Sequence, residues 1–205
     1  MDFDLDQTDA LLATTRSVRK RLDLTRPVPT EVLLDCIRLA VQAPTGGNAQ
    51  TWRWLVVDDA ETKAALAELY ARDGRGYLGS YQRDALDGQT NRVLDSADFL
   101  LEVLDQVPAM VIPCVKGRLA DPAPIMASSM YGSIVPAVWS FQLALRSRGL
   151  GSCYTTLHLI HEQEAAELLS IPYEEVTQVA LLPVAYTVGT DFKPALRGPV
   201  ERITY

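Results

Sequence analysis

The segment 129–147 most constrains the fold, because as a helix it would be apolar on nearly every side. It contains no charged residue before Arg146. A helix without a polar face has to be buried, either inside a large core or between subunits. We expect Pro136 to kink this helix or to separate its first turns from the rest. With 205 residues, the chain can bury the helix within one domain, or within a domain that a partner chain completes.

The remaining pattern predicts helices that cover a sheet with few strands. Many helices alternating with few strands indicate a single domain over residues 1–205, of the α+β class (an α/β sandwich). Pro183 lies inside the last predicted strand and indicates an edge or a bulge there. Apolar periodicity predicts helices over 8–15, 30–42, 61–72, 91–105 and 162–169, and extended segments over 53–57, 108–115, 150–157 and 176–187.

Three polar stretches are predicted to lack regular structure. Residues 73–90 contain four glycines and show no apolar period, and long loops of this kind are usually lids or disordered segments. Residues 116–128 form a second polar loop that contains prolines. Residues 189–205 form an extended, proline-rich C-terminal arm.

Charge and composition argue against several classes of protein. The formal net charge is −7, the opposite of what a nucleic-acid-binding protein usually carries. The longest apolar run, Ile134 to Leu145, is too short to cross a bilayer. Three widely spaced cysteines favour reduced thiols, and the acidic N-terminus lacks the features of a signal peptide. We therefore expect a cytoplasmic protein with neither nucleic acid nor membrane as a partner.

The connection from Ala43 to Trp52 carries more polar groups than a tight turn needs. It joins a predicted helix to a predicted strand and reads Ala-Pro-Thr-Gly-Gly-Asn-Ala-Gln-Thr-Trp. Adjacent glycines let backbone N–H groups approach a bound group closely, and Asn48 and Gln50 offer both donors and acceptors. Gly, Pro and Asn also dominate ordinary turns. These residues alone leave a ligand site and a plain loop equally open.

A basic run, Arg16-Ser17-Val18-Arg19-Lys20-Arg21, follows the first predicted helix of this acidic chain. Arginine binds phosphate through two N–H donors, and a serine hydroxyl adds a third contact. By alternation, Lys20 and Arg21 would point away from such a site. The run therefore predicts an anion site, with a solvated basic surface as the alternative.

The stretch from Gly149 to His158 begins like a dinucleotide-binding fingerprint but departs from it at Tyr154, and it follows a helix instead of a strand. His158 and His161 lack a third metal ligand at a defined spacing, and no local signature gives Cys153 a partner histidine. We therefore expect no metal and no catalytic side chain. An anion site with few acid–base groups suits a bound cofactor that carries the chemistry.

Taken together, these segments resemble the FMN-dependent nitroreductase superfamily, and within it the small actinobacterial-type nitroreductases. Any one of the shared motifs is weak evidence, but four in order at compatible spacing are strong. They are Thr15 to Arg19, Ala43 to Trp52, a long apolar helix followed by Gly149 to Ser152, and Arg197-Gly198-Pro199 in the tail.

The resemblance implies a central mixed or antiparallel sheet covered by helices, and an intertwined homodimer with FMN at the interface. It assigns the FMN phosphate and ribityl chain to the segment Arg16, Ser17, Val18 and Arg19, with added charge from Arg197. It assigns contacts from the partner subunit to Pro44, Thr45, Gly46, Asn48 and Gln50. The stretch Thr155, Thr156, Leu157 and His158 would lie against the isoalloxazine ring, with a backbone N–H facing N5.

Three positions depart from the family pattern. Thr15 replaces the first arginine of an Arg-Arg pair, so one phosphate contact is in doubt. Thr51 replaces a proline at the entry to the strand, which removes no polar contact. Ala195 stands where some members have a lysine. Binding of the phosphate should therefore depend more strongly on Arg16, Arg19 and Arg197.

The resemblance implies an enzyme, a ping-pong oxidoreductase in which NAD(P)H donates hydride to N5 of bound FMN. Nitroaromatics, quinones or similar small aromatic molecules would be the electron acceptors. Loops 73–90 and 116–128 would form lids over the acceptor pocket. Two alternatives stay open: an FMN-dependent oxidase or dehydrogenase that tailors a small metabolite, and a protein that binds or sequesters flavin with little turnover.

Overall fold

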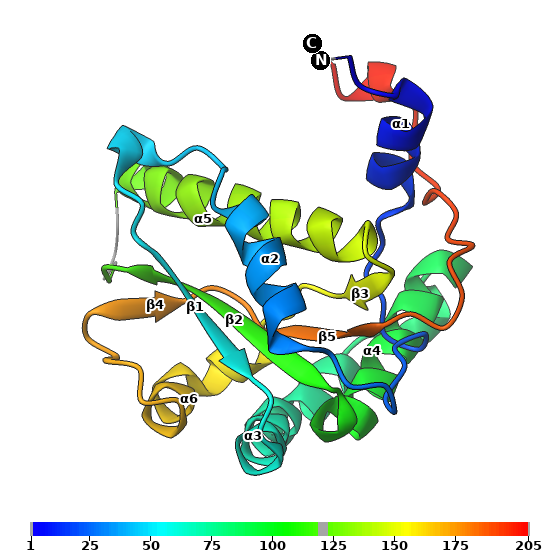
Figure 1. Cartoon of the computed structure of the whole chain (residues 1–205). Helices are drawn as coiled ribbons and strands as arrows, with labels where there is room; N and C mark the ends of the chain where they lie inside the picture. The colour runs from blue at the N-terminus through cyan, green and yellow to red at the C-terminus, as the bar shows by residue number, and fades with distance from the viewer. Residues whose placement is uncertain (1, 119–122, 205) are drawn as a thin grey trace.

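The computed structural model describes residues 2–118 and 123–204, and its centre is an antiparallel sheet covered by helices on both faces (Figure 1). The described strands follow the order β1-β2-β5-β3, with β4 also paired to β2. The α+β class and the helix-covered antiparallel sheet are therefore confirmed. The strands are β1 (Trp52–Val57), β2 (Ala109–Lys116), β3 (Leu150–Ser152), β4 (Val176–Gln178) and β5 (Leu182–Tyr186).

Two layers of helices sandwich the sheet. One layer is α2 (Thr30–Ala40) with α5 (Pro124–Arg146), and the other is α3 (Ala60–Gly79) with α4 (Gly88–Val103) and α6 (Glu162–Leu168) (Figure 1). Strand β2 is buried along almost its whole length, and successive side chains enter opposite cores. This burial on both faces explains why its sequence is a continuous apolar run instead of an alternating pattern.

The apolar helix α5 begins earlier than the sequence pattern predicts, at Pro124 instead of residue 129, and it is not divided at Pro136. One side of the helix is buried against the sheet through Ile134, Phe141 and Leu145. Its other side is left exposed within this chain, including Tyr131, Val135 and Trp139. The prediction of a helix that is buried on every side therefore holds for only one face of α5 in the isolated chain.

The predicted loop 73–90 is wrong over most of its length, because α3 continues to Gly79 and α4 begins at Gly88. Glycines have low helix propensity, but Gly74 is buried where an added Cβ would lie 2.9 Å from a methyl group of Leu101. Close packing thus favours glycine inside this helix. Only 80–87 connects the two helices, and Asp87 accepts hydrogen bonds from the first backbone N–H groups of α4.

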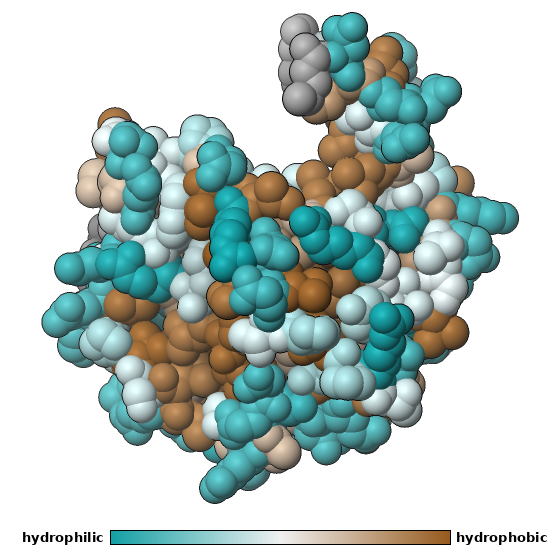
Figure 2. Space-filling model, viewed as in Figure 1, coloured by the Kyte–Doolittle hydropathy of each residue, from teal (hydrophilic) through white to brown (hydrophobic). Residues whose placement is uncertain are grey.

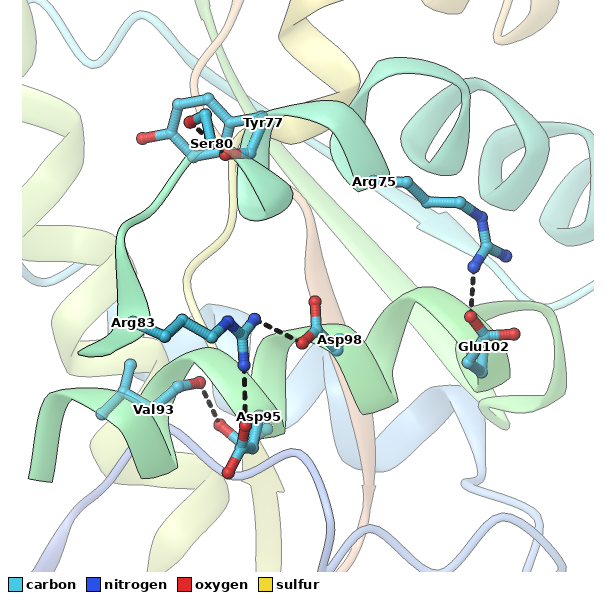
Figure 3. A network of polar contacts seen from close by, with 9 residues as sticks. Arg75, Tyr77, Ser80, Arg83, Val93, Asp95, Asp98 and Glu102 are labelled. Atoms are coloured by element: carbon cyan, nitrogen blue, oxygen red, sulfur yellow. Dashed lines mark hydrogen bonds and ion pairs between the residues drawn. The ribbon is translucent and has the colours of Figure 1, made fainter. Parts of the chain in front are cut away.

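Ion pairs hold the connection 80–87 against α4 (Figure 3). Arg83 donates to Asp95 at 2.7 Å and to Asp98 at 2.5 Å. Arg75 on α3 also pairs with Glu102 on α4. Exposed pairs of this kind add little stability individually, but together they fix how the connection crosses the two helices. The other predicted loop, 116–128, includes residues 119–122, which lie outside the described part of the chain.

Pro183 does not lie in an edge strand, because β5 pairs with β2 on one side and β3 on the other. Pro183 itself pairs regularly with Met110, so the predicted edge or bulge at this residue is wrong, but a bulge lies just before β5. Residues 179–181 separate β4 from β5, and they face only two residues of β2, Ile112 and Pro113. The extra residue interrupts the ladder in the manner of a β-bulge.

Both ends of the described chain stand away from the sheet (Figure 1). Helix α1 (Leu5–Thr14) buries none of its residues. The described part of the tail, residues 190–204, has no strand and one short 3₁₀ helix, Val200–Arg202. No helix in the described part of the chain is long and apolar enough to span a membrane.

We expect Gly151→Ala to lower the free energy of unfolding by about 1–3 kcal/mol, because overpacking a tight core contact has a cost of this size. An added Cβ at Gly151 would lie 2.7 Å from Thr187 Cγ2 and 2.9 Å from Val18 Cβ. Urea denaturation measures the change. Gly76→Ala is the matched control, since its Cβ would meet no atom within 4 Å and alanine favours the helix. Equal stability of the two variants would contradict the prediction.

Candidate functional site

A cleft of about 750 Å³ brings together the basic residues that follow α1 and the C-terminal arm. Arg16, Ser17 and Arg19 line one part of it, and Lys193 and Arg197 line another. Arg16 donates to the carbonyl oxygen of Lys193 at 2.7 Å, which ties the two segments together. Residues nearly two hundred positions apart therefore form one site. The predicted grouping of Arg16, Ser17 and Arg19 with Arg197 matches this cleft.

The cleft carries positive charge without counter-charges. Among the described residues, its lining includes five cationic side chains and no carboxylate. None of these five forms an ion pair with a described carboxylate, whereas Arg21, Arg38, Arg72, Arg75, Arg83 and Arg118 all do. Grouped like charges repel one another unless an anion neutralises them. The five cations are Arg16, Arg19, Arg92, Lys193 and Arg197.

The segment 16–19 reaches this position by lying beside β3. Ser17 bridges to Ser152 in the parallel direction, and the Val18 N–H donates to the Ser152 carbonyl at 2.9 Å. The Val18 side chain is buried in the core, so it anchors the segment instead of lining the cleft. Alternation along this extended segment puts Ser17 and Arg19, the two neighbours of Val18, on the face opposite the buried anchor.

Arg92 on α4 is a cleft residue that the sequence pattern does not single out. It lines the cleft together with Gln89, Val93 and Ser96 from the same helix. Ser96 Oγ accepts a hydrogen bond from Arg19 at 3.2 Å. The spacing of 89, 92, 93 and 96 is that of one helix face, and all but Gln89 fall in the predicted helix 91–105. No local motif marks Arg92 as a ligand-binding residue, because its place in the cleft depends on segments that are distant in the sequence.

The loop Ala43 to Trp52 lies apart from the arginine cleft within one chain, near the first turns of α5 (Figure 1). Pro44, Thr45, Asn48 and Gln50 line a separate cavity of about 430 Å³. Gly46 borders another cavity of about 270 Å³ and donates its N–H to Ser133 of α5 at 2.9 Å. None of these loop residues lines the arginine cleft.

Backbone conformation in this loop is unusual. Gly47, Asn48 and Gln50 all have positive φ, of 57°, 54° and 49°. Left-handed conformations are uncommon for residues other than glycine and often mark functional segments. The Gln50 side chain donates to Asn48 Oδ1 at 3.0 Å, so the two carboxamides hold each other at the exposed tip of the loop.

The stretch from Thr155 to His158 follows β3 and packs against α3. The Thr155 hydroxyl lies 2.7 Å from the Tyr70 hydroxyl. Thr156 is exposed, Leu157 is half-buried beside Gly74, and His158 is fully buried. Tyr154, just before this stretch, lines a cavity of about 220 Å³ together with Arg16 and Ser17. The stretch therefore continues from a cavity that borders the arginine cleft and shares Arg16, Ser17 and Trp139 with it.

Acid–base groups are scarce around the cleft. Burial lowers the pKa of His158 to about 4, so its imidazole is neutral at physiological pH. Burial also raises the pKa of the Cys153 thiol to about 11, although the nearby Arg19 opposes this shift. In the described part of the chain no three His, Cys, Asp or Glu side chains are grouped so that they would hold a metal ion. The arrangement favours binding of an anionic group over acid–base or thiol chemistry.

The model of the nitroreductase family matches residues 12–186, which includes every predicted site segment except the tail with Arg197. Iodotyrosine deiodinase of Thermotoga neapolitana is 29% identical over 177 residues, 85% of this chain and 86% of the relative. 5,6-Dimethylbenzimidazole synthase of Rhodospirillum rubrum is 28% identical over 178 residues, 82% of this chain and 77% of the relative.

Solved structures agree with these sequence relatives. An iodotyrosine deiodinase bound to FMN and 3-iodo-L-tyrosine superposes with a TM-score of 0.69 and 25% identity, covering 92% of this chain and 93% of that chain. The FMN-dependent nitroreductase NfnB from Mycobacterium smegmatis, in complex with NADPH, gives a TM-score of 0.70 at 18% identity, covering 98% of this chain and 99% of that chain. The second likeness concerns the fold alone.

We expect the buried His158 to make stability depend on pH. The unfolded chain protonates this histidine below about pH 6.5, and the folded chain does so only near pH 4. The free energy of unfolding should therefore fall by about 3 kcal/mol as the pH drops from 6.5 to 4, then level off. Urea unfolding across this range measures the loss.

The control for this prediction uses the other histidine of the chain. His158→Leu should remove this part of the pH dependence, whereas His161→Gln should keep it, because His161 is not fully buried. If wild type and His158→Leu lose stability in parallel over this pH range, the prediction is wrong.

Proposed function

Because the chain belongs to the nitroreductase family, we propose that it is an FMN-dependent oxidoreductase that passes electrons from NAD(P)H to a small aromatic acceptor. The observation that carries this proposal is the cleft with five cations and no described carboxylate partner. Its volume of about 750 Å³ is in the range of cofactor pockets. The donor set fits a phosphorylated ligand such as FMN.

Arg16, Arg19, Arg92 and Arg197 would hold the phosphate end, and Ser17 would add a hydroxyl. Arginine donors match phosphate oxygens in pairs, and each charge-assisted bond is stronger than a neutral one. Bound FMN supplies hydride transfer, which the side chains of this protein cannot perform. The described lining of the cleft holds no Asp, Glu, His or Cys, so protons for the reaction would come from water.

The segment Thr155 to His158 would border the ring of the cofactor in this proposal. Its backbone is fixed at Thr155, because the N–H and the carbonyl oxygen of this residue both hydrogen-bond to Leu181, at 3.2 and 2.8 Å. A rigid backbone donor does not need to reorganise during the reaction. The neutral His158 behind it adds no charge to the site.

A homodimer would complete the site. Exposed apolar side chains follow one face of α5 at four-residue spacing, Tyr131, Val135 and Trp139. Figure 2 shows hydrophobic surface along the hollow between the body and the arm formed by α1 and the C-terminal tail. Leu196, Val200 and Ile203 of that tail are more than half exposed. A second copy seated in the hollow would cover this surface and bring the loop Ala43 to Trp52 to the partner's cleft.

A second candidate function rests on the names of the sequence relatives. Iodotyrosine deiodinase and 5,6-dimethylbenzimidazole synthase both match more than four-fifths of this chain. They favour an FMN-dependent enzyme that transforms one small aromatic metabolite and is not a general NAD(P)H nitroreductase. Anaerobic mixing with NADH or NADPH separates the two: rapid bleaching of the flavin supports the first, and slow bleaching by both supports the second.

We expect purified protein to bind FMN and show its yellow spectrum. Arg19→Ala and Arg92→Ala should each raise the Kd for FMN about 10- to 100-fold, because each removes a charge-assisted contact. Fluorescence titration with FMN measures Kd. Arg38→Ala is the control, since Arg38 is paired with Glu31 and Asp35 outside the cleft. Failure of the wild type to bind FMN would falsify the proposed function.

We expect Val135→Asp to convert a dimer into a monomer, because a charge buried in an apolar interface is strongly unfavourable. Light scattering after size exclusion measures the mass. Ile160→Asp is the control, as Ile160 is also half exposed but lies outside α5. A wild-type monomer, or a Val135→Asp dimer, contradicts the proposed assembly.

A further inference from the structure

Tyr70 places a buried hydroxyl directly behind the segment that follows β3. The tyrosine lies in the middle of α3 and is 2% exposed. Its hydroxyl is 2.7 Å from Thr155 Oγ1, and no other described side chain or backbone group hydrogen-bonds to it. Thr155, in contrast, is half-buried. The two hydroxyls therefore differ in the partners that each can reach.

This difference decides which hydroxyl donates. A buried O–H without an acceptor destabilises the fold by about 1–3 kcal/mol. If Thr155 donated to Tyr70, the tyrosine proton would have no acceptor among the described residues. If Tyr70 donates to Thr155, the threonine proton can turn toward the partly open side. Burial raises the pKa of Tyr70 to about 12, so the phenol keeps its proton at neutral pH.

The Tyr70–Thr155 pair lies near Arg19 of the arginine cleft, although neither residue of the pair lines that cleft. The guanidinium of Arg19, which lines the cleft, is close enough to oppose the pKa shifts of both Tyr70 and Cys153. Residues 16–19 run beside β3, and Thr155 follows that strand by three residues. The pair is thus near Arg19, one of the residues that would hold the cofactor.

Helix α3 holds this segment at two points one helical turn apart. Tyr70 contacts Thr155, and Gly74 packs on Leu157, where an added Cβ would lie 3.1 Å from Leu157 Cδ1. The segment cannot shift along the helix without losing one of these contacts. The direction of the Thr155 hydroxyl is therefore set by the helix as well as by its own backbone.

We propose that Tyr70 is a positioning residue: it donates to Thr155 Oγ1 and so directs the Thr155 proton out of the core, toward the bound cofactor. This inference rests on the proposed binding of FMN. A hydrogen-bond donor aimed at the cofactor favours the form that carries more negative charge. Removing Tyr70's hydroxyl or Thr155's hydroxyl should therefore make reduction of bound FMN less favourable.

The first test uses protein without FMN and asks only which hydroxyl donates. Thr155→Val should lower the Tm, because it leaves the Tyr70 O–H without an acceptor, and adding Tyr70→Phe should restore most of the loss. Tyr70→Phe alone should change the Tm little. A rise in Tm for Tyr70→Phe, with no change for Thr155→Val, means that Thr155 donates and overturns the proposal.

The second test uses the FMN-loaded protein and the midpoint potential of the flavin. Tyr70→Phe and Thr155→Val should each shift the potential to more negative values, and the double variant should shift no further than Thr155→Val. Thr155→Ser should restore the wild-type potential. The Kd for FMN should change less than threefold, because the arginines are untouched. Tyr186→Phe is the control, since its ring packs under Arg26 away from this pair.

The results separate this inference from the proposed function. If wild-type protein binds FMN and both single variants keep the wild-type potential, the role of Tyr70 is overturned and the proposed function stands. If wild-type protein binds no FMN, the proposed function fails, and so does the role of Tyr70 in orienting a group toward the cofactor. The Tm measurements on protein without FMN still decide the direction of the hydrogen bond in that case.

Discussion

The close approach of residues 16–19 to β3 is the contact on which the candidate site depends. Gly151 has no side chain where Val18 and Thr187 come within 3 Å of its missing Cβ position. This lets the Val18 N–H bond to Ser152 while Arg16 and Arg19 face the cleft. The same strand then leads to Thr155, so one contact fixes both the anion-binding residues and the segment beside them.

Pairing distinguishes the arginines of the cleft from most others in the described chain. Outside the cleft, six arginines pair with neighbouring carboxylates, as Arg83 does with Asp95 and Asp98. In the cleft, Arg16 and Arg19 hydrogen-bond to a carbonyl and a hydroxyl, which leave their charge uncompensated. A protein with net charge −7 has many carboxylates with which to balance them. Their absence from the cleft is the physical basis for assigning an anionic ligand there.

Sequence reasoning failed where packing outweighed local propensity. Three glycines within 73–79 suggest a loop, yet α3 continues through them because the contact at Gly74 leaves no room for a side chain. Arg92 falls inside the predicted helix 91–105, but no local motif connects it with residues 16–19 across the cleft. The predicted edge or bulge at Pro183 was wrong for a related reason, since the bulge at 179–181 depends on a partner strand that lies far away in the chain.

The sequence by itself determined the fold class and the family, because these follow from periodicity and from motifs that are local in the chain, and the family resemblance implies the grouping of Arg16, Ser17 and Arg19 with Arg197. Only the tertiary structure decided that Arg92 joins this group and that Val18 is an anchor. It also decided that the loop Ala43 to Trp52 lies outside the cleft of its own chain. Whether a charge is compensated, and which buried hydroxyl has an acceptor, depends on distances between segments that are remote in sequence. Local sequence patterns do not determine those distances, because the distances arise only when the chain folds.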